Sequence, residues 1–126
     1  MRIEDRVSND IVFIEPRERL TVETEPAFAH HIVRLLEAGR TKFVLNLEHV
    51  PYIDSVGLGA IVRAYTSARR RGGDLKLLNV VGRNRHLFSI TKLLTVFHEY
   101  ESEKDIHSDS GFTVHPQDFT RRPKTT

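Results

Sequence analysis

A buried-strand pattern followed by an amphipathic-helix pattern is the feature that most constrains the fold of this chain. The run Phe43–Leu47 is almost continuously apolar, which is typical of a strand buried on both faces. Beyond a short loop, apolar residues recur at helical spacing until Gly72-Gly73, namely Leu58, Ile61, Val62, Tyr65 and Ala68. A strand buried on both faces needs helices to cover it. The pair therefore predicts an α/β fold.

The rest of the chain alternates in the same way. We expect strands in residues 1–7, 11–14, 42–47 and 74–80, helices in 24–38, 58–71 and 84–91, a short final strand in 93–97 and a closing helical turn at 102–106. Ser8-Asn9-Asp10 suits a tight hairpin turn. The predicted order is strand–strand–helix–strand–helix–strand–helix–strand. It implies a mixed sheet whose first pair is antiparallel and whose remainder is largely parallel, with right-handed crossovers.

Length and composition predict one domain. The 126 residues suffice for one core, which we place at residues 1–107, and the polar stretch 108–126 is expected to be a flexible tail. The chain has no cysteine, no apolar run near the roughly 20 residues that span a bilayer, and no signal-peptide core at its N-terminus. We therefore expect a cytoplasmic protein that does not contact membranes.

Charge argues against nucleic acid as a direct partner. The formal net charge is only +2, and acidic and basic residues are interspersed. The two arginine clusters, 69–71 and 121–122, lack the interleaved aromatic residues of a single-strand binder. A solvated helix end is the ordinary explanation for such arginines.

The loop between the strand at 42–47 and the following helix carries the candidate chemistry. Its sequence is Asp54-Ser55-Val56-Gly57-Leu58-Gly59, so a serine hydroxyl lies at a helix N-terminus. That hydroxyl can cap the helix, or Asp54 can be the cap. The same position would hold a phosphate near unpaired backbone N–H groups. The residues alone leave both the structural and the chemical role open.

Other chemistry finds little support. The nucleophile elbow of a serine hydrolase needs glycine two residues before its serine, where this chain has Ile53. The glycine-rich dinucleotide-binding motif would need a third glycine, where this chain has Val62. His30 and His31 are adjacent and so do not share a helix face for a metal. We expect no catalytic residues, no metal and no cofactor, and hence no enzyme.

The pattern as a whole resembles a known family. The residues that carry the likeness are Phe43-Val44-Leu45-Asn46-Leu47, Asp54-Ser55-Val56-Gly57-Leu58-Gly59, Arg71-Gly72-Gly73-Asp74-Leu75, Leu87-Phe88 and the segment 93–97. Their order and spacing resemble the STAS domain of bacterial anti-sigma-factor antagonists over roughly residues 3–106. The resemblance implies the STAS fold. One departure is the stretch Arg17–Thr21, where many members carry a Gly-Glu-Leu-Asp-like turn, so partner contacts there are expected to differ.

The resemblance also implies a mechanism. Ser55 would be phosphorylated by a GHKL-type serine kinase that doubles as the anti-sigma factor, and a PP2C-like phosphatase would reverse this. Unphosphorylated chain would bind the anti-sigma factor and release the sigma factor. The partner would contact residues 54–59, with Gly57 and Gly59 allowing close backbone packing.

A second function is open under the same fold. It is a STAS scaffold without a phosphorylation switch, in a signalling assembly or as an accessory subunit of a membrane transporter. A second copy of the chain is a further candidate partner.

Overall fold

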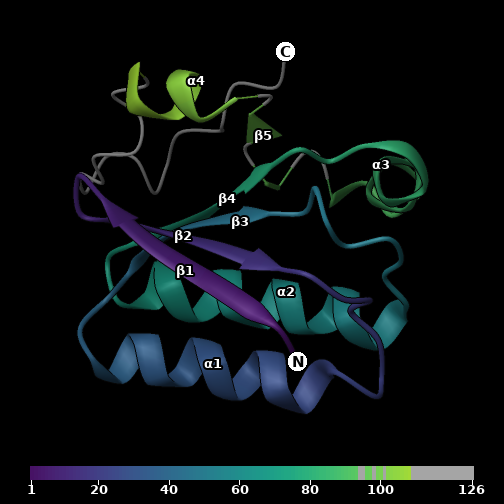
Figure 1. The fold of residues 1–126 in the computed structure, drawn as a ribbon, viewed down its shortest axis with the longest axis horizontal. Coiled ribbons are helices and arrows are strands. Elements are labelled where there is room, and N and C mark those ends of the chain that lie inside the picture. The colour runs from purple at the N-terminus through teal and green to yellow at the C-terminus, as the bar shows by residue number, and fades with distance from the viewer. Residues whose placement is uncertain (94–95, 98, 101, 109–126) are drawn as a thin grey trace.

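The computed structural model describes residues 1–93, 96–97, 99–100 and 102–108 and has the expected alternating order. The elements are β1 (Ile3–Ser8), β2 (Ile11–Pro16), α1 (Glu25–Glu37), β3 (Lys42–Asn46), α2 (Ser55–Arg70), β4 (Asp74–Leu78), α3 (Gly82–Ile90), β5 (Glu99–Tyr100) and α4 (Glu103–Ser108) (Figure 1). The expected polar tail begins at 108, and its residues 109–126 lie outside the described part of the chain.

The strands form one mixed sheet in the order β1-β2-β3-β4-β5. β1 and β2 pair antiparallel, with Ile3 opposite Pro16 and Ser8 opposite Ile11. The pairs β2–β3, β3–β4 and β4–β5 are all parallel. The predicted α/β fold class and mixed sheet are therefore confirmed. Because β2, β3 and β4 run in the same direction, the segments that follow them emerge at one edge of the sheet.

Helices α1 and α2 lie side by side against one face of the sheet (Figure 1). Strand residues of alternate parity point to that face and meet the apolar stripes of the two helices. This main core includes Val12, Ile14, Phe28, Ile32, Leu36, Phe43, Leu45, Ile61, Ala68, Leu75, Leu77 and Phe88. The spacing of Phe28, Ile32, Leu35 and Leu36 predicts one buried face for the first helix. The structure confirms it, with Phe28, Ile32 and Leu36 buried and Leu35 partly buried.

The opposite face of the sheet carries a smaller apolar cluster, which α4 covers (Figure 1). Its members are Ile11, Phe13, Val44, Leu78, Tyr100 and Ile106. Lys76, on β4 with Leu78, is buried as well. Its Nζ lies 3.6 Å from Asp74 Oδ2 and 5.8 Å from the Tyr100 ring centroid. Both faces of the central strands are therefore covered, as their continuous apolar character predicts.

The last strand lies further along the chain than the sequence pattern predicts. The expected strand at 93–97 is wrong, because β5 is Glu99–Tyr100. The amides of Val96 and Phe97 donate to the Leu93 carbonyl at 2.9 and 3.0 Å, which forms a turn. Phe97 instead packs its ring edge-on against Tyr65 and Phe88. An apolar run can be buried by a turn as well as by a strand, and its period does not distinguish the two.

The hairpin between β1 and β2 has the expected tight turn. Asn9 and Asp10 occupy its two central positions with φ of 52° and 70°. Asparagine and aspartate tolerate this left-handed conformation better than other non-glycine residues, and two such positions match the twist of a hairpin. The turn predicted at Ser8-Asn9-Asp10 is confirmed.

Candidate functional site

Three connecting segments meet at the carboxyl edge of the parallel strands. The segment after β2 joins the loop before α2 through a parallel bridge between Leu20 and Ile53. The Leu20 amide donates to the Tyr52 carbonyl at 2.9 Å, and the Asp54 amide donates to the Leu20 carbonyl at 3.1 Å. From the third segment, the buried Asn84 side chain donates to the Val50 carbonyl at 2.7 Å. The loop before α2 is thus held from both sides.

Asp54 is the N-cap of α2, which resolves the alternative left open by the sequence. Its backbone is extended, and its Oδ1 accepts from the Gly57 amide at 2.8 Å. Its Oδ2 accepts from the Val22 amide at 2.9 Å. One carboxylate therefore caps the helix and also fixes the neighbouring segment, a contact that lies 32 residues away in sequence.

These hydrogen bonds keep Asp54 ionised. The Gly57 and Val22 amides both stabilise the charged form and lower the pKa of the Asp54 carboxyl below its ordinary 3.8. Asp54 is partly exposed at the rim of the site. A fixed negative charge therefore lies directly beside Ser55.

Replacing Asp54 with alanine should change how stability depends on pH. A lowered pKa in the folded state contributes stability above the unfolded pKa, about 3.9, and this contribution is lost as pH falls through the folded value. We expect the free energy of unfolding, measured by urea denaturation, to fall more steeply below about pH 4 for the wild type than for Asp54→Ala. The exposed Glu37→Ala variant controls for loss of one negative charge. Equal acid sensitivity of the wild type and Asp54→Ala would contradict the cap assignment.

Ser55 is the first residue of α2, and its side chain is exposed. Among the residues that the structure describes, none forms a hydrogen bond with its hydroxyl. The hydroxyl is not the cap, because Asp54 has that role. The hydroxyl is therefore exposed to a partner, and it makes no hydrogen bond within the part of the chain that the structure describes.

The other predicted site residues divide between two faces of α2. Val56 is 37% exposed and Gly59 is partly exposed, whereas Gly57 and Leu58 are buried. A Cβ on Gly57 would lie 2.0 Å from the Leu20 carbonyl oxygen, so the close approach of that segment requires glycine. A Cβ on Gly59 would meet only the Arg63 guanidinium, at 3.3 Å. A partner could thus touch Asp54, Ser55, Val56 and Gly59, while Gly57 and Leu58 support them.

Further side chains at this edge were not identified from the sequence. Val22 is 60% exposed, Tyr52 is 39% exposed and Val81 is 60% exposed. The Arg83 guanidinium lies 5.7 Å above the Tyr52 ring centroid, joining the third segment to the second. We call Val22, Tyr52, Val56 and Val81 the apolar collar. The rule that carboxyl ends of parallel strands meet at one edge could have found these residues.

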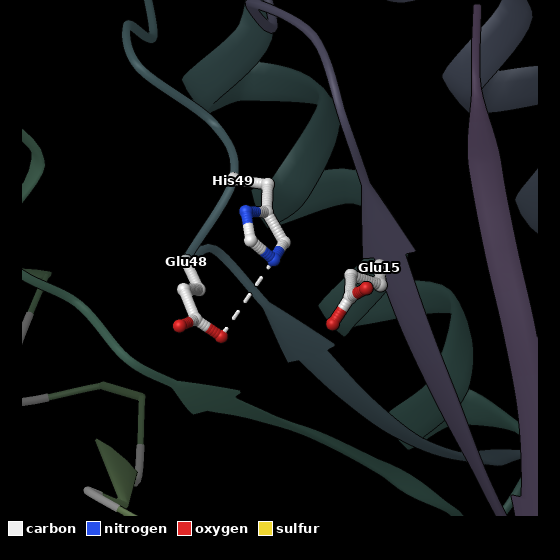
Figure 2. Close-up of side chains that lie close together, drawn as sticks. All are labelled: Glu15, Glu48 and His49. Carbon is white, nitrogen blue, oxygen red and sulfur yellow. Dashed lines mark ion pairs between the residues drawn. The ribbon is translucent and has the colours of Figure 1, made fainter.

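Glu15, Glu48 and His49 form the one group in the described part of the chain whose ligand atoms lie close enough to share a metal ion (Figure 2). One ligand atom from each lies within 4.8 Å of the others. The Glu15 carboxylate, however, already accepts from Arg17 at 2.7 Å and from the Asn46 amide at 2.9 Å. A guanidinium beside the carboxylate disfavours a second cation, so we assign the group as an ion-pair network.

A cavity of about 460 Å³ lies over the face of the sheet that α4 covers. It is lined by Glu4, Asp5, Arg6, Phe13, Glu15, Asn46, Leu78 and Glu103. An Arg6 side-chain nitrogen donates to Glu103 at 2.8 Å, and the guanidinium stacks 4.5 Å from the Phe13 ring centroid. Glu4 and Glu15 pair with Arg17, and Asp5 pairs with His31, so the charged groups of the lining already have partners. The lining includes none of residues 54–59.

The arginine cluster at the end of α2 is partly committed to structure. Arg69 lies 3.4 Å from the Asp74 carboxylate, and Arg71 donates to the Leu36 carbonyl at 2.9 Å. Of the adjacent histidines, His30 is exposed and His31 contacts the Asp5 carboxylate at 2.7 Å. These contacts account for side chains that could otherwise suggest a nucleic-acid interface or a metal site.

Within the described residues, no helix is both long enough and apolar enough to cross a membrane.

Comparison with known proteins gives a consistent result. The STAS domain family model matches residues 2–106. The chain is 29% identical over 101 residues to the anti-sigma-B factor antagonist of Staphylococcus aureus, covering 80% of this chain and 94% of that protein.

Two solved structures resemble the fold. A candidate anti-sigma factor antagonist from Thermotoga maritima superimposes with a TM-score of 0.80 at 25% identity, covering 84% of this chain and 92% of that one. The Bacillus cell fate determinant SpoIIAA in its phosphorylated form gives 0.67 at 20% identity, covering 85% and 98%. At that identity the likeness to SpoIIAA shows the fold alone.

Proposed function

The chain belongs to the STAS domain family, and from that premise we propose that it is an anti-sigma-factor antagonist switched off by phosphorylation of Ser55. In this proposal the unphosphorylated chain binds an anti-sigma factor and so releases a sigma factor. The Staphylococcus aureus relative, named an anti-sigma-B factor antagonist, supports the role. The observation that carries the switch is the Ser55 hydroxyl, which is exposed beside the Asp54 carboxylate and has no hydrogen bond among the described residues.

The partners follow from the same premise. We propose that the anti-sigma factor is a GHKL-type serine kinase that supplies ATP and the catalytic groups, and that a PP2C-like phosphatase reverses the modification. The chain itself then acts as substrate and binding module, in line with relatives that are named for antagonism. Residues 54–56 and 59, together with the apolar collar, form the proposed contact surface.

The proposed switch works through local charge. Phosphorylation adds about −1.5 to −2 charge at pH 7 and three acceptor oxygens. The apolar collar lies on the segments that meet at the same edge of the sheet as Ser55, and a partner would bury its side chains. Burying a phosphate dianion among valines is costly unless it is paired, and the Asp54 carboxylate beside it repels it. Affinity should therefore fall without refolding of the domain.

Incubation with the candidate kinase and ATP tests the modification. We expect mass spectrometry to find a single phosphate on a peptide containing Ser55, and Ser55→Ala to abolish it. Ser67→Ala, on the same helix, should be phosphorylated like the wild type. A phosphate on another residue, or none with an active kinase, would refute the proposed site.

Binding measurements test the switch separately. Ser55→Ala should bind the anti-sigma factor about as well as the wild type, because the hydroxyl makes no described hydrogen bond. Ser55→Glu should bind at least roughly tenfold more weakly, since about 1.4 kcal/mol of charge and desolvation cost gives that factor. Calorimetric titration measures both. If the two variants bind alike, the charge-based switch is refuted even where the serine is phosphorylated.

A further inference from the structure

Ser55, Gly59 and Arg63 lie in one row along α2. They recur every four residues, so they share one face of the helix. Gly59 has no side chain, and the Arg63 side chain fills that place. The Arg63 NH1 atom lies 3.3 Å from the position that a Cβ on Gly59 would occupy. The guanidinium is therefore one helical turn closer to Ser55 than its own backbone is.

The present partner of Arg63 is easily exchanged. Its NH2 atom lies 3.3 Å from Oε2 of Glu25, the first residue of α1. The Arg63 side chain is 63% exposed, so water and salt screen this single contact. A dianion with three acceptor oxygens offers the guanidinium a stronger, bidentate alternative.

Part of the hydrogen-bonding capacity at the start of α2 is already in use, so a nearby cation would add to the binding of a phosphate on Ser55. The Asp54 carboxylate already accepts hydrogen bonds from the Gly57 and Val22 amides, so these donors are taken. Cβ atoms four residues apart on a helix are about 5–6 Å from one another. A phosphoryl group lengthens the Ser55 side chain enough to span most of that gap, while the Arg63 guanidinium lies over Gly59.

Building on the proposed phosphorylation of Ser55, we infer that Arg63 is the binding residue for the phosphate. On phosphorylation its guanidinium exchanges the Glu25 carboxylate for the phosphate oxygens. Of the charged groups that the structure describes at this end of α2, Asp54 comes from the loop, Glu25 from α1 and Arg63 from α2 itself. The two carboxylates raise the second pKa of the phosphate, and Arg63 lowers it.

Phosphorus NMR on protein with phosphoserine installed at position 55 during translation tests this inference. The chemical shift reports the second ionisation of the phosphate, ordinarily near pH 6. We expect Arg63→Gln to raise this pKa by about 0.5 unit, as loss of a partly exposed ion pair predicts. Arg63→Lys should recover part of the difference, and 1 M salt should reduce it. Arg70→Gln, an exposed arginine at the far end of α2, is the matched control and should leave the titration unchanged.

Each outcome decides the inference. A titration of Arg63→Gln identical to the wild type would overturn it, and so would equal shifts for Arg63→Gln and Arg70→Gln, which would indicate only a change in overall charge. Gly59→Leu provides an independent check, because its side chain would displace the guanidinium and should raise the pKa as Arg63→Gln does. Installed phosphoserine bypasses the kinase. A failure here is therefore distinct from a failure of the proposed phosphorylation.

Discussion

Replacing Gly57 with alanine is expected to lower the melting temperature by roughly 10 °C. The new Cβ would lie 2.0 Å from the Leu20 carbonyl oxygen and 2.6 Å from the carbonyl carbon, both of them backbone atoms that cannot rotate away. Overpacking of this kind costs about 2–3 kcal/mol, even after the better helix propensity of alanine is counted. Calorimetry measures the change.

The matched control for this prediction is Gly59→Ala, two residues along the same helix. There the new Cβ would meet only the flexible end of Arg63, at 3.3 Å. Alanine is favoured over glycine in a helix by about 1 kcal/mol, so Gly59→Ala should melt at or above the wild-type temperature. If Gly57→Ala is as stable as Gly59→Ala, the tight contact between α2 and the segment after β2 is refuted.

Replacing Phe28 with alanine is expected to cost about 3–5 kcal/mol of unfolding free energy, a large part of the total for a domain of this size. Phe28 is fully buried where α1 meets the main core. Removal of its ring would leave a cavity that the two helices and the sheet cannot close. Urea denaturation should show a lower midpoint with an unchanged slope.

Val33→Ala is the control on the same helix. Val33 is 47% exposed beside the buried stripe of α1, and its replacement should change the free energy of unfolding by only a few tenths of a kcal/mol. Similar losses for Phe28→Ala and Val33→Ala would mean that α1 does not bury the predicted stripe.

Most of the fold could be predicted because each pattern is local. The stripe Phe28, Ile32 and Leu36 defines one face of α1 without reference to the rest of the chain. Asn9-Asp10 likewise marks a hairpin turn through backbone preferences alone. The misplaced final strand shows where such patterns fail. The apolar Phe97 is buried by packing on Tyr65 and Phe88 from a turn, and Val96 stays 38% exposed.

Only part of the candidate site could be predicted, because sequence patterns are local. The loop at 54–59 is contiguous, so its motif stands out in the sequence. Val22 and Arg83 belong to no motif, and they join the site only because strands β2, β3 and β4 end at one edge.

By itself, the sequence determined the element order, the face that α1 buries and the serine at the start of α2. These follow from residue spacing and backbone preference, which act over a few neighbouring residues. Only the tertiary structure decided that Asp54 rather than Ser55 caps the helix, that Gly57 must be glycine and that Arg63 extends over Gly59 toward Ser55. The cap choice and the Gly57 requirement depend on where Leu20 and Val22 lie in space, and the Arg63 position on which rotamer its long side chain adopts. Residue spacing along the chain specifies neither.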